Sequence, residues 1–422
     1  MSCNLVLLVF NCEAVAFRDC DSQSLVNPIK GGGGSMKSLV PNENALSGRL
    51  PSLDGWRAVS ILMVLGAHSA SSPTIQKVGE SPVFFPLVDG YLGVRFFFVI
   101  SGFIITYLLL RERGKCGEID LKAFYIRRAL RILPVYLAYL IVVALLQLFG
   151  EVRQQLITWI GDLTFTVNFL PRGVISGHLW SLCVEEQFYL IWPPVLIWLS
   201  GQRKLYLYWI VLALPLITAL TFHIIAVTNA FPRILHPLFH ENSSFLNFDA
   251  LDMGCIAAFL LAKRGDQLKE ILATNKHWMI TVLGAVLILG PAYSWFAHGG
   301  VVVFLNQVAG TTLQAVGFAM LLLSSILYPR RFPVLNWPVV VYIGFISYSI
   351  YIWQQIYCGY EPDYQTPDYF IFRFPGTIVA AFITAIISYY FLESPVLKLK
   401  SRLRRYRPEN NNSKTVSAPI PD

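Results

Sequence analysis

The chain has 422 residues, of which 55% are hydrophobic and 14% charged, and its formal net charge is +8. Soluble globular chains carry about 25% charged residues, so this composition excludes an ordinary water-soluble fold. The excess of basic residues lies in short segments beside apolar blocks, where it would orient the chain in a membrane, and nucleic-acid binding is not expected. An α-helical integral membrane protein is therefore predicted, because transmembrane helices satisfy their own backbone in lipid.

Residues 1–35 differ from the rest of the chain and are expected to lie outside the fold. The apolar stretch 1–10 is too short to span a bilayer and, unlike a secretory signal, has no basic residue before it. The Gly/Ser run 31–35 has the composition of a flexible linker and directly precedes Met36. We interpret residues 1–35 as a disordered, tag-like or misassigned leader, and residues 36–52 as a cytoplasmic lead-in.

Apolar blocks of roughly 20 residues, the length that crosses a bilayer, follow one another from residue 53 to residue 396. This region is predicted to be all-α, a polytopic membrane domain of about ten transmembrane helices. The expected spans are 55–71, 92–110, 132–149, 181–199, 205–228, 248–262, 278–297, 305–328, 339–358 and 371–392. Residues 397–422, first basic and then rich in Asn, Ser and Pro, are expected to form a disordered cytoplasmic tail.

The basic residues predict the orientation of these spans, since Lys and Arg favour cytoplasmic loops. With both termini in the cytoplasm, the inner loops and the tail hold the basic clusters, which lie at 111–131, 203–204, 263–276, 330–331 and 398–407. The outer loops then carry only one or two basic residues each. Counting the moderately apolar stretch 156–169 as another span would place the later clusters outside. Residues 151–180 are therefore predicted to be an outer-face or re-entrant segment.

The first span carries two ionisable residues, Arg57 and His68. Placing such side chains in lipid costs free energy, so their presence in an apolar span has to be explained. They are eleven positions apart, so on a helix they lie within about 20° of one face and about 16 Å apart along the axis. An always-charged guanidinium at the inner end suits a phosphate-bearing donor, and an imidazole further along suits a general base. The alternatives are that Arg57 is an interfacial anchor and His68 a helix-packing residue.

The next two spans contain, or directly follow, arginines and small residues that have a structural or a functional interpretation. In the second span, Ser101 and Gly102 could allow close approach of a neighbouring helix, and Arg95 could anchor the span at the interface. In the loop just before the third, Arg128 and Arg131 are three apart and would share a face if this stretch is helical. Two guanidinium groups there could clamp phosphates, although a cluster of this kind also serves as a topology signal.

The fourth span opens with two adjacent carboxylates, Glu185 and Glu186, which packing alone does not explain. They point about 100° apart and therefore need different partners. One of them could orient His68, as in a His–acid pair. Glu393 ends the last span and is expected only to close the helix. No pair of cysteines has metal-ligand spacing, and Pro237 breaks the helix between His236 and His240, so no metal site is expected.

These motifs together resemble acyltransferase family 3, membrane proteins that O-acylate polysaccharides, Nod factors and other glycosides. The resemblance follows the family's order from about residue 50 to residue 396. The matching stretches are Leu53–Ala58 with His68, Gly93–Phe103, Phe124–Pro134, His178–Pro193, Phe248–Ala257, Ile346–Trp353 and Phe391–Pro395. Each stretch alone is weak evidence for the family, but their combination is specific to it.

The resemblance implies an acyl-coenzyme A donor, acetyl-CoA above all, at the cytoplasmic face, and a carbohydrate or glycoside acceptor on the other side. It places the chain as a multi-pass protein of the bacterial inner membrane, in contact with lipid and without a bound cofactor. The family's motifs fall on His68, Glu185 and Glu186 as catalytic residues and on Arg57, Arg128 and Arg131 as donor-binding residues. Further residues would line the site, namely Asp54, Ser101, Gly102, Trp180, Ser181 and Tyr189.

Two expected features of this chain differ from those of many family members. The chain is expected to be the stand-alone form, without the SGNH hydrolase-like domain that some relatives carry. Gln354 follows Trp353 where many relatives have His, so a catalytic role at this position is not expected. A transporter or flippase, or a catalytically inactive family member, stays open as an alternative. Consumption of acetyl-CoA by the purified protein would separate the enzyme from both.

Overall fold

A computed structural model describes residues 50–398, apart from 70–71, 82–83, 203, 229–237, 239, 275–276, 294–299 and 359–368. Within these ranges the protein consists of helices and connecting turns, without strands, which confirms the predicted all-α class. The expected leader and most of the lead-in and tail lie outside the described residues.

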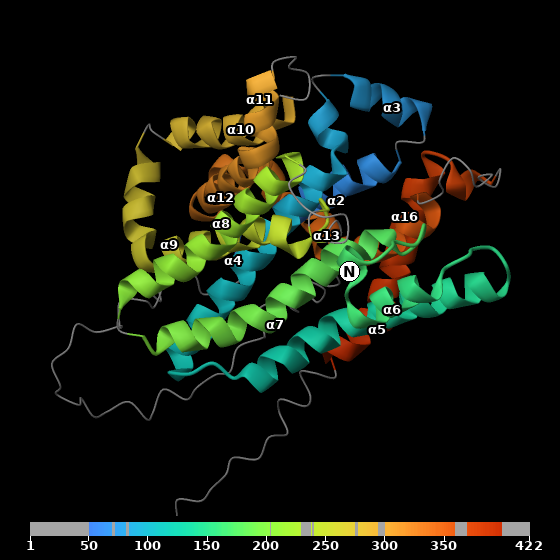
Figure 1. Ribbon diagram of the computed structural model, residues 1–422, viewed down its shortest axis with the longest axis horizontal. Coiled ribbons are helices and arrows are strands. Elements are labelled where there is room, and N and C mark those ends of the chain that lie inside the picture. The colour runs from blue at the N-terminus through green and yellow to red at the C-terminus, as the bar shows by residue number, and fades with distance from the viewer. Residues whose placement is uncertain are drawn as a thin grey trace, which may run out of the picture.

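The first half of the described chain forms five long helices and several short ones (Figure 1). The longer helices are α2 (Leu53–His68), α4 (Gly90–Cys116), α5 (Leu121–Leu148) and α7 (Trp180–Ser200), followed by α8 (Leu205–Thr228). The short elements are α3 (Pro73–Glu80), η2 (Phe85–Val88), α6 (Leu156–Thr164), η3 (Val167–Phe169) and η4 (Gly177–Leu179).

The second half contains more broken helices. It comprises α9 (Ser244–Ala273), α10 (His277–Tyr293), α11 (Gly300–Leu305), the π-helical η7 (Asn306–Gly310) and α12 (Thr311–Leu327). It continues with η8 (Pro329–Arg331), η9 (Pro333–Asn336), α13 (Pro338–Phe345), α14 (Ser347–Trp353) and α15 (Gln355–Cys358). It ends with η10 (Phe370–Phe372), α16 (Gly376–Ser388) and the π-helical η11 (Tyr389–Glu393).

Local sequence signals fix the ends of the two longest helices of the first half. The Asp89 side chain caps α4 by accepting a hydrogen bond from the Leu92 N–H, and Asp120 caps α5 through the Ala123 N–H. Gly117 ends α4 with a φ of +77°, the left-handed conformation that glycine adopts without a steric penalty. The turn between α4 and α5 is therefore encoded by the residues 117–120.

The centre of the molecule is the crossing of α4 and α9. A Cβ on Gly102 would lie 1.8 Å from the Leu251 carbonyl oxygen, and one on Gly254 would lie 2.1 Å from the Val99 oxygen. Glycines on both helices thus permit backbone contact, as small residues do in membrane proteins. In Figure 1, α8, α10 and α12 lie around α9, and α5 runs beside α7 on the opposite side of α4.

Arg95 joins these central helices and is not the interfacial anchor expected from the sequence. Its side chain is fully buried and forms an ion pair with Asp249 of α9 at 2.8 Å. The guanidinium also donates to the Thr311 carbonyl of α12 at 3.0 Å. The sequence could not show this because the two partners are separated by 154 residues. A buried charge is tolerated when it is paired and hydrogen-bonded, and Arg95 meets both conditions.

Every expected span coincides with at least one helix, but the structure does not confirm ten crossings. Six described helices are long and apolar enough to cross a membrane, or seven if the bent pair of residues 338–345 and 347–358 is one broken span. The first expected span, α2, has 16 residues and is shorter than a usual crossing. The segment predicted not to span, 151–180, contains only the nine-residue helix α6 and two short 3-10 turns.

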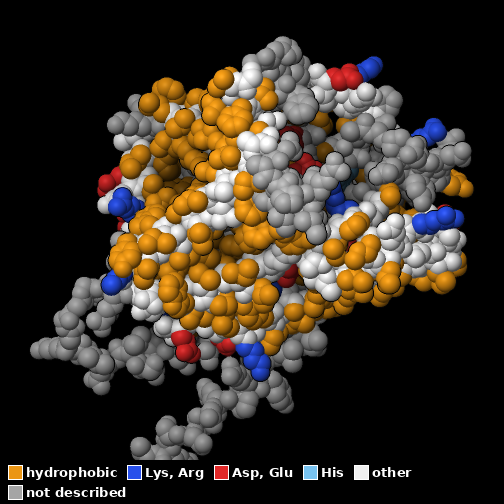
Figure 2. All heavy atoms as spheres, in the orientation of Figure 1, with side chains coloured by type: hydrophobic (Ala, Val, Ile, Leu, Met, Phe, Trp, Pro, Cys, Tyr) orange, Lys and Arg blue, Asp and Glu red, His pale blue; other side chains and the backbone are white. Residues whose placement is uncertain are grey.

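The outer surface of the helices is apolar, as contact with lipid requires. On α5, Leu133, Leu137, Ile141, Leu145 and Leu148 recur every three or four residues and are exposed. Figure 2 shows hydrophobic side chains over much of the visible face, with most of the visible Lys and Arg near its margins. The described protein is therefore a multi-pass membrane protein with a buried polar interior.

Candidate functional site

A cavity of about 300 Å³ lies between α2, α4, α5, α7, α14 and the end of the last helix. Its wall combines apolar and aromatic side chains with an unusual density of charge. Five arginines and four carboxylates line it within the described residues, namely Arg57, Arg111, Arg127, Arg128 and Arg131, with Asp54, Glu112, Glu185 and Glu393. A pocket this rich in charge inside apolar helices marks a binding site.

One face of α7 forms a wall of the cavity. Ser181, Glu185 and Tyr189 line it and are spaced by four residues, so successive helical turns place them one above another. Glu186 and Trp180 are each one residue away from a lining position and do not line the cavity. One carboxylate oxygen of Glu186 is buried and has no hydrogen-bond partner in the part of the chain described. The adjacent carboxylates thus have different surroundings, as their 100° separation predicts.

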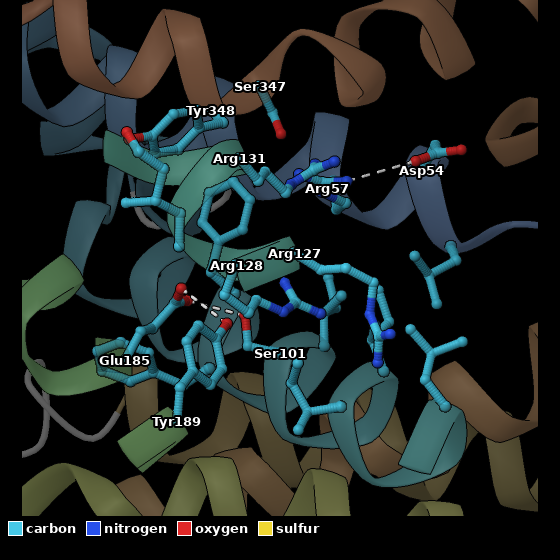
Figure 3. Close-up of a pocket in the computed structure, with 18 of the residues that line it drawn as sticks. Asp54, Arg57, Ser101, Arg127, Arg128, Arg131, Glu185, Tyr189, Ser347 and Tyr348 are labelled. Atoms are coloured by element: carbon cyan, nitrogen blue, oxygen red, sulfur yellow. Dashed lines mark hydrogen bonds and ion pairs between the residues drawn. The ribbon is translucent and has the colours of Figure 1, made fainter. Parts of the chain in front are cut away.

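Glu185 is held by two hydroxyl groups at the cavity wall (Figure 3). The Ser101 hydroxyl of α4 donates to Glu185 Oε1 at 2.8 Å, and the Tyr189 hydroxyl donates to Oε2 at 3.1 Å. These bonds fix the carboxylate between α4 and α7. Glu185 therefore does not have the expected partner, because its two hydrogen bonds go to Ser101 and Tyr189 and not to His68.

Arg128 stacks on aromatic rings of the same wall. Its guanidinium carbon lies 5.2 Å from the centre of the Tyr189 ring and 5.9 Å from that of Phe124. Stacking fixes the plane of the guanidinium and leaves its N–H edge for in-plane bonds. In the described residues the Arg128 guanidinium makes no hydrogen bond, and Figure 3 shows it projecting between the neighbouring side chains of the cavity.

Two other arginines of the cavity are balanced by carboxylates. Arg57 lies 3.7 Å from Asp54 one turn earlier on α2, and Arg127 forms an ion pair of 2.9 Å with Glu112 of α4. Arg131 lines the cavity beside Arg57 in Figure 3. The three expected donor-binding residues, Arg57, Arg128 and Arg131, thus converge on a single cavity although they come from two helices.

His68 lies outside this cavity, at the opposite end of α2 from Arg57. Its Nδ1 atom is 2.9 Å from Oε1 of Gln354, so its hydrogen-bond partner is the glutamine and not either glutamate. The side chains of Ile61 and Leu65, which share this side of α2, are buried in the apolar core. The cavity therefore ends before it reaches the imidazole.

Two residues expected to line the site pack elsewhere. Gly102 faces Leu251 of α9 because it lies about 100° around α4 from Ser101. The Trp180 ring packs between Tyr91 and Phe98, with ring centres 6.3 and 6.1 Å apart. Gly102 and Trp180 do not line this cavity, and both residues pack against neighbouring helices.

The short helix α14 contributes residues that the sequence did not single out. Ser347, Tyr348 and Tyr351 line the cavity. The Tyr351 hydroxyl lies 2.5 Å from the Ser181 hydroxyl and donates to the His178 carbonyl at 2.5 Å. Both His178 ring nitrogens face backbone carbonyls, of Ile175 and Ile352, so this buried histidine has a structural environment.

Glu393 is the clearest candidate site residue that the sequence pattern did not identify. It was expected only to end a helix, yet it lines the cavity and accepts a hydrogen bond from the Ser349 hydroxyl. Arg111, Glu112 and Arg127 also line the cavity. The signal for these residues in the sequence is the density of charge at the span ends, which membrane topology also explains. No cluster in the described residues could hold a metal ion.

Comparison with known proteins places this geometry in context. The family model of an acyltransferase domain matches residues 50–393. The peptidoglycan O-acetyltransferase OatA of Listeria monocytogenes is 28% identical over 377 residues, which cover 83% of this chain and 56% of that protein. The O-acetyltransferase OatA of Staphylococcus aureus strain MRSA252 is 26% identical over 391 residues, 86% of this chain and 60% of that protein. The chain thus spans little more than half of these relatives, and no solved structure matches it significantly.

Proposed function

The chain belongs to the acyltransferase family whose domain it matches over residues 50–393, and on this premise we propose that it is a membrane O-acyltransferase. It transfers an acetyl or other short acyl group from acyl-coenzyme A to a hydroxyl of a carbohydrate or glycoside. The observation that carries the proposal is the cavity lined by five arginines within apolar helices. The relatives named as O-acetyltransferases support acetyl as the group transferred.

The arginines suit the donor because coenzyme A carries several phosphates. Guanidinium groups bind phosphate through two parallel N–H bonds, and these charge-assisted bonds are about twice as strong as neutral ones. Arg128 is oriented by stacking on Tyr189, and Arg57 and Arg131 approach from other sides of the same cavity. We assign these three residues to the donor phosphates. Asp54, Ser101, Ser181 and Tyr189 then line the donor pocket.

His68 is the proposed base for the acceptor hydroxyl. An alcohol attacks a thioester slowly unless its proton is removed, and a base near neutral pKa contributes typically a factor of 10²–10⁴. His68 is about 16 Å along α2 from Arg57, so phosphate binding and proton removal occur at different depths. In this proposal the pantetheine arm of the donor has to pass the packed side chains of Ile61 and Leu65 to connect the two levels. Glu185, fixed by Ser101 and Tyr189, holds the aromatic wall under Arg128 and offsets its charge.

The acceptor is a surface or secreted carbohydrate. The Listeria relative is named for peptidoglycan, which is itself a glycan with free hydroxyls, and this makes peptidoglycan one acceptor to test. In this proposal the chain lies in the bacterial inner membrane, takes the donor from the cytoplasm and presents the acyl group on the opposite side.

Purified protein tests the proposal directly. With acetyl-CoA and a glycan acceptor, we expect release of free coenzyme A thiol, measured with a thiol reagent, together with acetyl esters on the glycan. A transporter or an inactive scaffold would leave both at the level of protein-free controls. Release of thiol without acetylated glycan would show hydrolysis and would contradict the assigned acceptor class.

A further inference from the structure

Gln354 lies at the junction of α14 and α15 and is fully buried. Its backbone is fixed from both sides, because its N–H donates to the Ile350 carbonyl and its carbonyl accepts from Tyr357 and Cys358, each at 3.0 Å. The side chain extends to α2, where Oε1 lies 2.9 Å from His68 Nδ1. A residue from a distant part of the chain thus has a rigid contact with the histidine.

With Oε1 of Gln354 facing Nδ1, the contact indicates which ring nitrogen of His68 carries the proton. An amide oxygen only accepts hydrogen bonds, so Nδ1 must be the donor and carry hydrogen. In a neutral imidazole the other nitrogen, Nε2, then keeps its lone pair. The Gln354 amide nitrogen is buried and has no partner among the described residues, so the hydrogen bond to His68 is the only one that this side chain makes there.

We propose that Gln354 is a positioning residue that holds His68 in the Nδ1–H tautomer and leaves Nε2 as the basic atom. The inference deepens the proposed function, since it rests on His68 acting as the base there. Gln354 acts through His68 and need not touch the substrate. Because its partner is a neutral amide, the imidazolium formed during turnover is not stabilised by a carboxylate on Nδ1.

Other titratable groups lie on the elements around this end of α2. They are His178 in η4, Asp89 at the start of α4, Tyr351 in α14 and Cys358 in α15, whose sulfur is 3.8 Å from the Ser69 hydroxyl. Within the described chain, none of these four forms a hydrogen bond to the His68 ring. Among those residues Gln354 is therefore the side chain that sets the ring's orientation.

Two substitutions separate positioning from packing. Gln354→Glu keeps the acceptor for Nδ1–H but adds a negative charge, which favours imidazolium. It should move the acidic limb of the pH profile of kcat/KM to higher pH.

Gln354→Met keeps the length of the side chain and removes the hydrogen-bond acceptor. It should lower kcat roughly 10- to 100-fold, the usual effect of losing an orienting partner, while KM for acetyl-CoA stays unchanged. Gln355→Met is the matched control, since Gln355 bonds the Val174 carbonyl instead.

The tautomer itself provides a readout that does not depend on activity. In ¹⁵N-histidine-labelled protein, with His68 assigned from its loss in His68→Gln, we expect the Nδ1–H form in the wild type and a mixture in Gln354→Met. An Nε2–H tautomer in the wild type would overturn the inference. So would an unmoved pH profile in folded Gln354→Glu together with unchanged kcat in Gln354→Met. If the wild type shows the Nδ1–H form but no acyl transfer, the proposed function fails and the positioning stands.

Discussion

At the scale of residues, helical spacing decides which side chains share the cavity. Ser181, Glu185 and Tyr189 follow one another at intervals of four and line it, whereas Glu186 faces elsewhere. The sequence predicted that the two glutamates need different partners but could not choose between them, because α7 has apolar neighbours on several sides. It also could not find the contact between His68 and Gln354, which are 286 residues apart.

The first residue prediction concerns His68. Replacing it with Gln keeps a side chain that can hydrogen bond to Gln354 and removes the basicity. Acyl transfer should then fall at least ~100-fold, the low end of general-base effects, in a protein that still inserts in the membrane. The measurement is initial rate of acetyl transfer at matched expression. Near-normal activity of His68→Gln would make His68 a packing residue.

The second concerns donor binding by Arg128. Arg128→Lys keeps the charge but loses the planar fork and the stacking on Tyr189. We expect KM for acetyl-CoA to rise about tenfold, equivalent to one charge-assisted hydrogen bond of about 1.4 kcal/mol, with little change in kcat. Arg153→Lys, at an exposed position away from the cavity, is the control. Equal KM values for the two variants would contradict donor binding by Arg128 and would leave it only a role in membrane topology.

At the scale of elements, hydropathy predicted the helices well and their mutual contacts poorly. The expected span 205–228 coincides with α8, and 181–199 differs from α7 by one residue at each end. In contrast, α5 begins eleven residues before the expected 132 because its first turns are basic, and the span 339–358 is broken near Ile346 with a bend of 53°. The apolarity of a segment indicates contact with lipid or with the protein core. It does not show that a helix extends into a charged end, or that a helix bends within an apolar run.

The α4–α9 crossing gives a prediction at this scale. Gly102→Ala would place a Cβ 1.8 Å from the Leu251 carbonyl oxygen, so the two backbones must separate. We expect a loss of about 1–3 kcal/mol, the usual cost of overpacking, seen as a lower midpoint of thermal unfolding in detergent. Gly290→Ala in α10 is the control, because nothing lies within 4 Å of its added Cβ. A midpoint for Gly102→Ala that matches the control would contradict the close packing.

At the scale of the whole molecule, the number of crossings and their direction stay predictions from loop charge. Six or seven described helices satisfy the length and apolarity of a span, whereas the shorter helix α2 carries the candidate site residues Asp54, Arg57 and His68. Of the helices that line the cavity, α4 and α5 satisfy these criteria, whereas α2 and α7 do not. The same charges that complicate the count define the site.

Reporter fusions test the orientation. Since the inner loops and the tail collect the basic residues, a fusion after Arg404 should be active with a cytoplasmic reporter and inactive with a periplasmic one. A fusion in the loop 151–155 should show the reverse. A periplasmic signal after Arg404 would contradict the ten-span count with both termini in the cytoplasm.

The central claim is that this chain transfers an acyl group to a carbohydrate, and mass spectrometry of glycans from living cells tests it most directly. Cells lacking the gene are compared with the same cells carrying the wild type or His68→Gln. We predict that one acetyl mass per modified unit disappears from a surface or secreted glycan on deletion, returns with the wild type and does not return with His68→Gln. Identical glycan spectra in all three strains, with the proteins present in the membrane, would contradict the account.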